Sequence, residues 1–193
     1  MSKKVLIING HPDQKSFNWA LSKAYAQGAI KGNAEVQTIN IQSLDFNPNL
    51  EFGYREKTVL EPDLEKAIAQ IEWCEHMVWI HPIWWYGYPA LMKGFIDRIF
   101  LPGIAFKYQK GKAFPKRLWK GKTGHIICTS DTPLWYNRWF MKNPSVNQLK
   151  KGTLEFCGIK PVRVTYIGPV KDSKKDTRQK WLQKVGNLGM QLR

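Results

Sequence analysis

The chain has 193 residues, enough for one well-buried domain (residues 1–193) and too few for two. With 43% hydrophobic and 23% charged residues, and no apolar run long enough for a membrane span or secretory signal, it is predicted to be a folded cytoplasmic protein. The net charge of +15 fits poorly with an acidic electron carrier and leaves anionic small molecules, nucleic acid or an anionic membrane surface as partners.

The first half of the chain alternates between strand and helix patterns. The apolar run Lys4–Asn9 predicts a buried strand, and the spacing of apolar residues over Ser16–Lys31 predicts a helix. Alternating residues over Glu35–Ile41 predict a second strand. A helix is expected over Pro62–Cys74, which opens with proline and carries an apolar stripe.

The second half continues this alternation. Strands are expected over His76–His81, Thr123–Thr129 and Pro161–Ile167, and helices over Pro89–Phe100, Ser145–Cys157 and Lys174–Leu192. Strict alternation predicts an α/β protein with a five-stranded parallel sheet and helices on both faces. Five strands fit the flavodoxin-like order 2-1-3-4-5, although the pattern itself does not reveal the order. In such sheets ligands bind beyond the carboxyl ends of the strands.

The loop after the first strand, Gly10–Asn18, has features of a phosphate site. Ser16 is a candidate N-cap, and the free N–H groups of the helix that follows, with the Asn18 amide, would suit a phosphate. The loop contains neither a dinucleotide G-x-G-x-x-G motif nor a P-loop, so any phosphate is held differently. The alternative is that Ser16 and Asn18 only cap and solvate the helix.

The loop after the third strand, His81–Pro89, contains three consecutive aromatic residues, Trp84, Trp85 and Tyr86. Neighbouring side chains of an extended segment point in opposite directions, so we expect only some of the three to be interior. A planar ring system held by stacking and backbone contacts explains the others. A dimer interface patch is the alternative.

The loop after the fourth predicted strand, Thr129–Tyr136, begins with small hydroxyl residues that could bond to a ring edge or a ribityl chain. Because Asp131 and Pro133 are equally typical of an ordinary turn, this loop is weak evidence by itself.

Together these loops resemble those of the NAD(P)H:quinone reductase (DT-diaphorase) family, within the wider flavodoxin-like quinone reductases and modulator-of-drug-activity proteins. The resemblance extends from about Val5 to about Ile167. It rests on His11 with Ser16-Phe17-Asn18-x-Ala20, Phe46-Asn47-Pro48, Pro82-x-x-Trp85-Tyr86-Gly87-x-Pro89-Ala90, Lys93-Gly94-Phe95, Arg98-x-Phe100, Ala105-Phe106-Lys107-Tyr108 and Phe156-Cys157-Gly158.

The resemblance implies a set of site residues. The flavin's phosphate end would be held by His11, Ser16, Phe17, Asn18 and Ala20, and its ring by Pro82, Ile83, Trp84, Trp85, Tyr86, Thr129 and Ser130. The pocket shared by nicotinamide and quinone would have the walls Tyr86, Phe106, Tyr108 and Phe156, and Tyr136 lies near a further tyrosine position of the family.

The resemblance also implies the reaction and the assembly. Hydride would pass from NAD(P)H to the flavin and then to a quinone in a ping-pong scheme. Phe106 and Tyr108 would reach in from a partner subunit, which implies a homodimer with composite sites. Ser16-Phe17-Asn18 implies FAD, whereas the short stretch after Asn47 keeps FMN as the alternative.

Two departures from the family pattern concern the third loop. Asp131-Thr132 stand where the family has paired glycines, and no histidine follows before Phe156.

Cys74, Cys128 and Cys157 form no C-x-x-C, and the spacing of His76, His81 and His125 is poor for joint ligation, so neither a metal site nor a catalytic thiol is expected.

Two other functions remain open from the sequence. Related flavoproteins serve as ancillary regulatory subunits of potassium efflux systems. The basic run Lys107–Lys122 could instead bind nucleic acid or another anionic polymer, but a solvated loop explains it more simply. Because the paired Cys/His and RNP-type aromatic motifs are missing, we do not expect nucleic acid as a partner.

Overall fold

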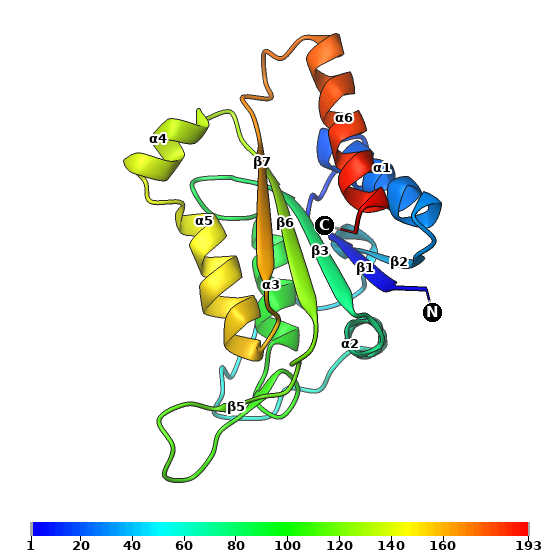
Figure 1. Cartoon of the computed structure of the whole chain (residues 1–193). Helices are drawn as coiled ribbons and strands as arrows, with labels where there is room; N and C mark the ends of the chain where they lie inside the picture. Colours follow the sequence, from blue (N-terminus) through cyan, green and yellow to red (C-terminus); the bar gives the residue numbers. More distant parts are fainter. Residues whose placement is uncertain (1, 193) are drawn as a thin grey trace.

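Five parallel strands form the central sheet in the order β2-β1-β3-β6-β7 (Figure 1). The computed structural model describes residues 2–192. The strands are β1 (Lys4–Asn9), β2 (Glu35–Asn40), β3 (His76–Pro82), β6 (Thr123–Thr129) and β7 (Val162–Ile167). Counted along the sheet this is the predicted order 2-1-3-4-5, and the flavodoxin-like fold is confirmed.

Helices cover both faces of the sheet. Alternate residues of β1 point to opposite sides: Val5 and Ile7 pack against α1 (Phe17–Lys31) and α6 (Lys175–Met190), which lie side by side in Figure 1. Leu6 and Ile8 belong to the core beneath the other helices. Those helices are α2 (Pro62–Trp73), α3 (Ala90–Ile99) and α5 (Pro144–Asn147), with α5 continuing into a π-helical segment, η2 (Gln148–Glu155).

Two projecting elements are not predicted by the hydrophobic pattern of the sequence. After α3, β4 (Phe106–Lys107) and β5 (Lys116–Arg117) form a small antiparallel hairpin, called the basic arm below (residues 106–117). After β6 comes a six-residue helix, α4 (Leu134–Trp139). They project from opposite ends of the molecule (Figure 1). Strands of two residues are too short to leave a periodic pattern.

The other short element is the 3₁₀ turn η1 (Ile41–Ser43), which ends the predicted strand Glu35–Ile41 one residue early.

Within residues 2–192, no helix combines the length and the apolar character needed to cross a membrane.

The close contact of α1 with α6 depends on a glycine pair. A Cβ atom at Gly28 would lie 1.9 Å from the carbonyl oxygen of Gly186, whereas one at Gly186 would lie 3.5 Å from the carbonyl oxygen of Ala24. We therefore expect Gly28→Ala to lower the free energy of unfolding by about 2 kcal/mol through overpacking. The matched variant Gly186→Ala should keep it or raise it by up to about 1 kcal/mol, because alanine favours helix. Urea titrations of both variants measure the difference, and equal effects would contradict it.

Candidate functional site

The loops after β1, β3 and β6 converge on one cavity of about 370 Å³, called the three-loop cavity below. The register of the sheet explains this, because Pro82 of β3 stands opposite Thr129 of β6. Beyond the pair, the Ile83 N–H donates to the Thr129 carbonyl at 2.7 Å. The predicted cofactor residues that line the cavity are His11, Ser16, Phe17, Asn18, Pro82, Ile83, Trp84, Thr129 and Ser130.

The amino end of α1 forms one wall of this cavity. The Ser16 side chain accepts a hydrogen bond from the Trp19 N–H at 3.3 Å, so Ser16 is the N-cap that the sequence predicts. The first turn of α1 contains no acidic residue, although Asp13 of the preceding loop lines the same cavity. The positive end of the helix dipole favours an anionic group at this wall of the cavity.

Asn18 joins the first and third loops from a buried position. Its Nδ2 donates to the Thr129 hydroxyl at 2.9 Å, and its side chain is 4% exposed. Its Oδ1 is buried and has no hydrogen-bond partner among the described residues. Because buried polar atoms are almost always paired, this oxygen fits a donor supplied by a ligand.

His11 joins the first and second loops. Its ring meets the Trp84 ring edge to face, with centroids 5.6 Å apart and an interplanar angle of 77°. Burial lowers the pKa of His11, although Asp13 opposes the shift. Its Nδ1 accepts a hydrogen bond from the Asp13 N–H at 2.9 Å. His11 is therefore a neutral ring at neutral pH.

The aromatic triplet forms a tight turn, so the prediction of an extended segment was wrong. Trp84 and Gly87 exchange backbone hydrogen bonds of 3.0 and 2.8 Å. The two central residues, Trp85 and Tyr86, have φ values of 48° and 59°. Positive φ at both positions is the geometry of a type I′ turn, usually made by Asn-Gly. Trp85 is consequently 100% exposed, and neither central residue lines the three-loop cavity.

A fourth loop, which the sequence analysis did not consider, completes the cavity. Asp131 Oδ1 accepts hydrogen bonds from the Val170 and Lys171 N–H groups at 3.2 and 2.7 Å, and both residues line the cavity. This contact explains why Asp131 stands in place of a family glycine. The rule that ligands bind at the carboxyl ends of parallel strands could have identified this loop. The carboxyl end of β7 lies at the same edge of the sheet as those of β3 and β6.

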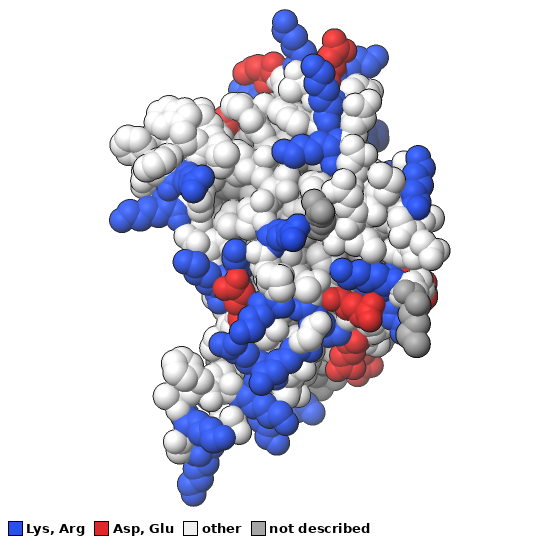
Figure 2. All heavy atoms as spheres, in the orientation of Figure 1, with Lys and Arg blue, Asp and Glu red and all other residues white. Residues whose placement is uncertain are grey.

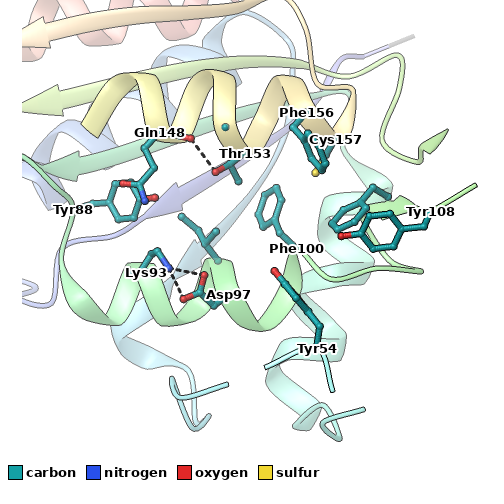
Figure 3. A pocket seen from close by; sticks show the side chains of 13 residues that line it. Tyr54, Tyr88, Lys93, Asp97, Phe100, Tyr108, Gln148, Thr153, Phe156 and Cys157 are labelled. Carbon is teal, nitrogen blue, oxygen red and sulfur yellow. Dashed lines mark hydrogen bonds and ion pairs between the residues drawn. The ribbon is translucent and has the colours of Figure 1, made fainter. Parts of the chain in front are cut away.

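A second cavity of about 330 Å³, called the aromatic cavity below, lies between α3 and η2 (Figure 3). Three predicted catalytic residues line it together. The Phe106 ring meets those of Tyr108 and Phe156 edge to face, at centroid distances of 5.4 and 5.1 Å. The three-loop cavity and the aromatic cavity share no lining residue. Within one chain these rings therefore do not line the three-loop cavity, although Tyr88 of the loop after β3 lines the aromatic cavity with them.

Besides Trp85 and Tyr86, the structure places two further predicted residues, Ala20 and Tyr136, outside both cavities. Ala20 lies in a groove between α1 and α6, one helical turn beyond the cavity-lining part of α1. Tyr136 lies on α4, where its ring stacks on Phe140 with centroids 5.3 Å apart and an angle of 16°. Its neighbours Trp135 and Trp139 are also exposed.

The thiols are poor nucleophiles in this structure. Cys157 lines the aromatic cavity, but burial raises the pKa of Cys157 to about 12, and the pKa values of Cys74 and Cys128 are raised equally. Burial also lowers the pKa of His81 to about 4, so this ring is neutral. Across residues 2–192, no cluster of three His, Cys, Asp or Glu residues is arranged to hold a metal ion.

Comparison with known proteins agrees with this architecture. An uncharacterised NAD(P)H oxidoreductase of Haemophilus influenzae is 26% identical over 170 residues, covering 86% of this chain and 83% of the relative. The mouse (Mus musculus) ribosyldihydronicotinamide dehydrogenase [quinone] is 27% identical over 186 residues, covering 82% and 78%.

Solved structures show the same fold. A protein of Streptococcus mutans superimposes with a TM-score of 0.84 at 31% identity, covering 97% of this chain and 99% of the other. The NAD(P)H:quinone oxidoreductase of Methanothermobacter marburgensis gives 0.83 at 20% identity, covering 100% and 98%. A family model described as flavodoxin-like fold matches residues 3–188. This chain therefore belongs to the flavodoxin-like fold family.

Proposed function

We propose that the chain is a flavin-dependent NAD(P)H:quinone oxidoreductase. The observation that carries the proposal is the convergence of the predicted loops on one cavity, where Asn18 Oδ1 lacks a partner and the first turn of α1 has no acidic residue. The names of the Haemophilus influenzae and mouse relatives, an NAD(P)H oxidoreductase and a quinone-linked dehydrogenase, support it.

The residues of the three-loop cavity fit a flavin. Ser16 and the free N–H groups of α1 would hold its phosphate, and Asn18 Oδ1 would accept a hydrogen bond from a hydroxyl group at the same end of the flavin. Backbone groups from Pro82 to Trp84, with Thr129 and Ser130, would hold the ring. When bound, the flavin would take up a hydride from the nicotinamide and donate it to the acceptor in separate half-reactions. The protein's own contribution is to bind, to orient and to exclude water.

A homodimer is part of this proposal. Phe106, Tyr108 and Phe156 line a cavity other than the three-loop cavity, and in this proposal a second copy places its rings over the flavin. A two-fold arrangement would then give two equivalent composite sites. We also retain a single domain and a cytoplasmic location, which the three free, buried cysteines support.

The decisive experiment is the absorption spectrum of the purified protein, followed by mass identification of the released chromophore. FAD is expected from the Ser16-Phe17-Asn18 motif, and FMN is the alternative outcome. The flavin-loaded protein should oxidise NADPH with menadione as acceptor. Colourless protein that binds neither FAD nor FMN in a calorimeter would overturn the proposal, whereas a bound flavin without NAD(P)H oxidation would favour an ancillary, non-catalytic role.

Asn18→Asp tests the phosphate end. The substitution removes the donor to Thr129 and places a carboxylate beside the expected phosphate, so flavin affinity should fall about 30-fold, equivalent to about 2 kcal/mol. Asn49→Asp is the matched control, because it makes the same charge change on an exposed loop. Flavin titrations by fluorescence quenching measure both affinities, and equal affinities would place the phosphate elsewhere.

A further inference from the structure

The basic arm concentrates positive charge without any compensating carboxylate. The arm contains five Lys and Arg residues, and the stretch from Ile104 to Thr123 around it contains seven in all and no Asp or Glu. In Figure 2 the projecting tip of the molecule shows Lys and Arg but no acidic residue. The cations are Lys107, Lys110, Lys112, Lys116, Arg117, Lys120 and Lys122.

The four lysines of the basic arm form no ion pair among the described residues, whereas Lys122 donates to the backbone of Glu72 and Cys74. Within residues 2–192, the ion pairs all involve other side chains, and Lys107, Lys110, Lys112 and Lys116 make no side-chain hydrogen bond. All four are exposed. Like charges held on one short hairpin repel each other, and a bound polyanion would relieve this repulsion.

The arm is physically joined to the aromatic cavity. Phe106 and Tyr108, at its start, form walls of that cavity, and Lys107 stands between them. From Tyr108 to Lys112 the backbone spans at most about 14 Å. A molecule whose planar ring occupies the aromatic cavity therefore has the arm's cations within reach of its remaining groups.

The aromatic cavity itself does not repel an anion. Asp97 is the acidic residue among its lining residues, and Lys93 Nζ contacts both Asp97 oxygens at 2.7 and 2.6 Å (Figure 3). This pair is locally neutral. The lining residues therefore add no net charge that would oppose the cations of the arm.

We propose that the basic arm binds the phosphates of the nicotinamide dinucleotide, with Lys110 and Lys112 at the 2′-phosphate, so that NADPH is preferred as hydride donor. This inference rests on the proposed function, in which the nicotinamide ring enters beside Phe106 and Tyr108. Lysine binds phosphate as a point charge on a long side chain, which suits exposed residues of a hairpin. In the homodimer each arm would serve the flavin of the other subunit.

The test compares Lys110→Gln/Lys112→Gln with Lys31→Gln/Lys66→Gln, which removes two exposed lysines on α1 and α2 and changes the net charge equally. Three donors are used with menadione: NADPH, NADH and ribosyldihydronicotinamide, which has no phosphate. The arm variant should lose about 10-fold or more in kcat/KM with NADPH, less with NADH, and nothing with ribosyldihydronicotinamide. The control should match the wild type with all three.

A binding measurement separates recognition from catalysis. Calorimetry with adenosine 2′,5′-bisphosphate and with 5′-AMP should show tighter binding of the bisphosphate by the wild type, and the arm variant should lose this difference. Unchanged bisphosphate binding, or an equal loss with all three donors, would overturn the inference. A wild type that binds the bisphosphate but oxidises none of the donors would instead refute the proposed function.

Discussion

Arg98→Ala is expected to lower the free energy of unfolding by about 3–5 kcal/mol. The Arg98 side chain is 1% exposed and lies 2.7 Å from the Glu61 carboxylate. It also donates to the carbonyl oxygens of Val59, at 2.9 Å, and Asn47. Alanine would leave two carbonyl groups without this donor, the Glu61 carboxylate without its counter-charge, and a cavity in place of the guanidinium.

The same contacts give Arg98 an indirect link to the site. They fix the long loop between η1 and α2, which carries Tyr54 to the edge of the aromatic cavity. Arg98→Lys keeps the charge but lacks the planar fork of donors, so its loss should lie between those of the wild type and alanine. Guanidinium unfolding monitored by tryptophan fluorescence measures the series. A loss below about 1 kcal/mol for alanine would show that the loop is held by other contacts.

The ion pair also predicts a pH dependence. Burial tends to raise the pKa of Glu61, but the hydrogen bonds from Arg98 and the Asn47 N–H lower it overall. A carboxylate whose pKa is lowered by folding stabilises the fold at pH values above its unfolded-state pKa. This contribution is lost as the pH falls through the folded-state pKa. Arg98→Ala should therefore lose less stability on acidification than the wild type does.

The central strands β1, β3 and β6 were predictable because they are buried on both faces and read as continuous apolar runs, as in Lys4–Asn9 and Thr123–Thr129. The basic arm and α4 were not predictable, because their regular segments are too short for periodicity. Helix Ser145–Cys157 was predicted in position, but its π-helical part, which creates one wall of the aromatic cavity, leaves no signature in residue spacing.

The residues of the candidate site were likewise predicted only in part from the sequence. Residues next to strand ends, such as Asn18, Pro82 and Thr129, were found because topology places them at one edge of the sheet. Lys171 was missed because the loop after the last strand was not considered. Phe106 lines the aromatic cavity and Tyr86 does not. This difference depends on the tertiary arrangement, which a single sequence does not encode as a local pattern.

Replacing Trp85-Tyr86 by Asn-Gly should make the protein more stable and much less active. Both residues have positive φ, which costs a non-glycine residue roughly 1 kcal/mol each, and Asn-Gly is the preferred sequence for this turn. The variant should therefore gain about 2 kcal/mol in the free energy of unfolding. Because the two rings are expected to contact the flavin and the acceptor, kcat/KM for menadione should fall about 100-fold.

Such opposite changes would identify the turn as a strained element retained for function, since strain of this kind concentrates at functional sites. Trp85→Phe is the matched control, because it keeps a ring and the positive φ and should leave both stability and activity close to the wild type. An Asn-Gly variant that is more stable and fully active would show that the exposed aromatic turn serves neither flavin nor acceptor. A variant that gains no stability would show that the surrounding hydrogen bonds between Trp84 and Gly87 already offset the cost of the turn.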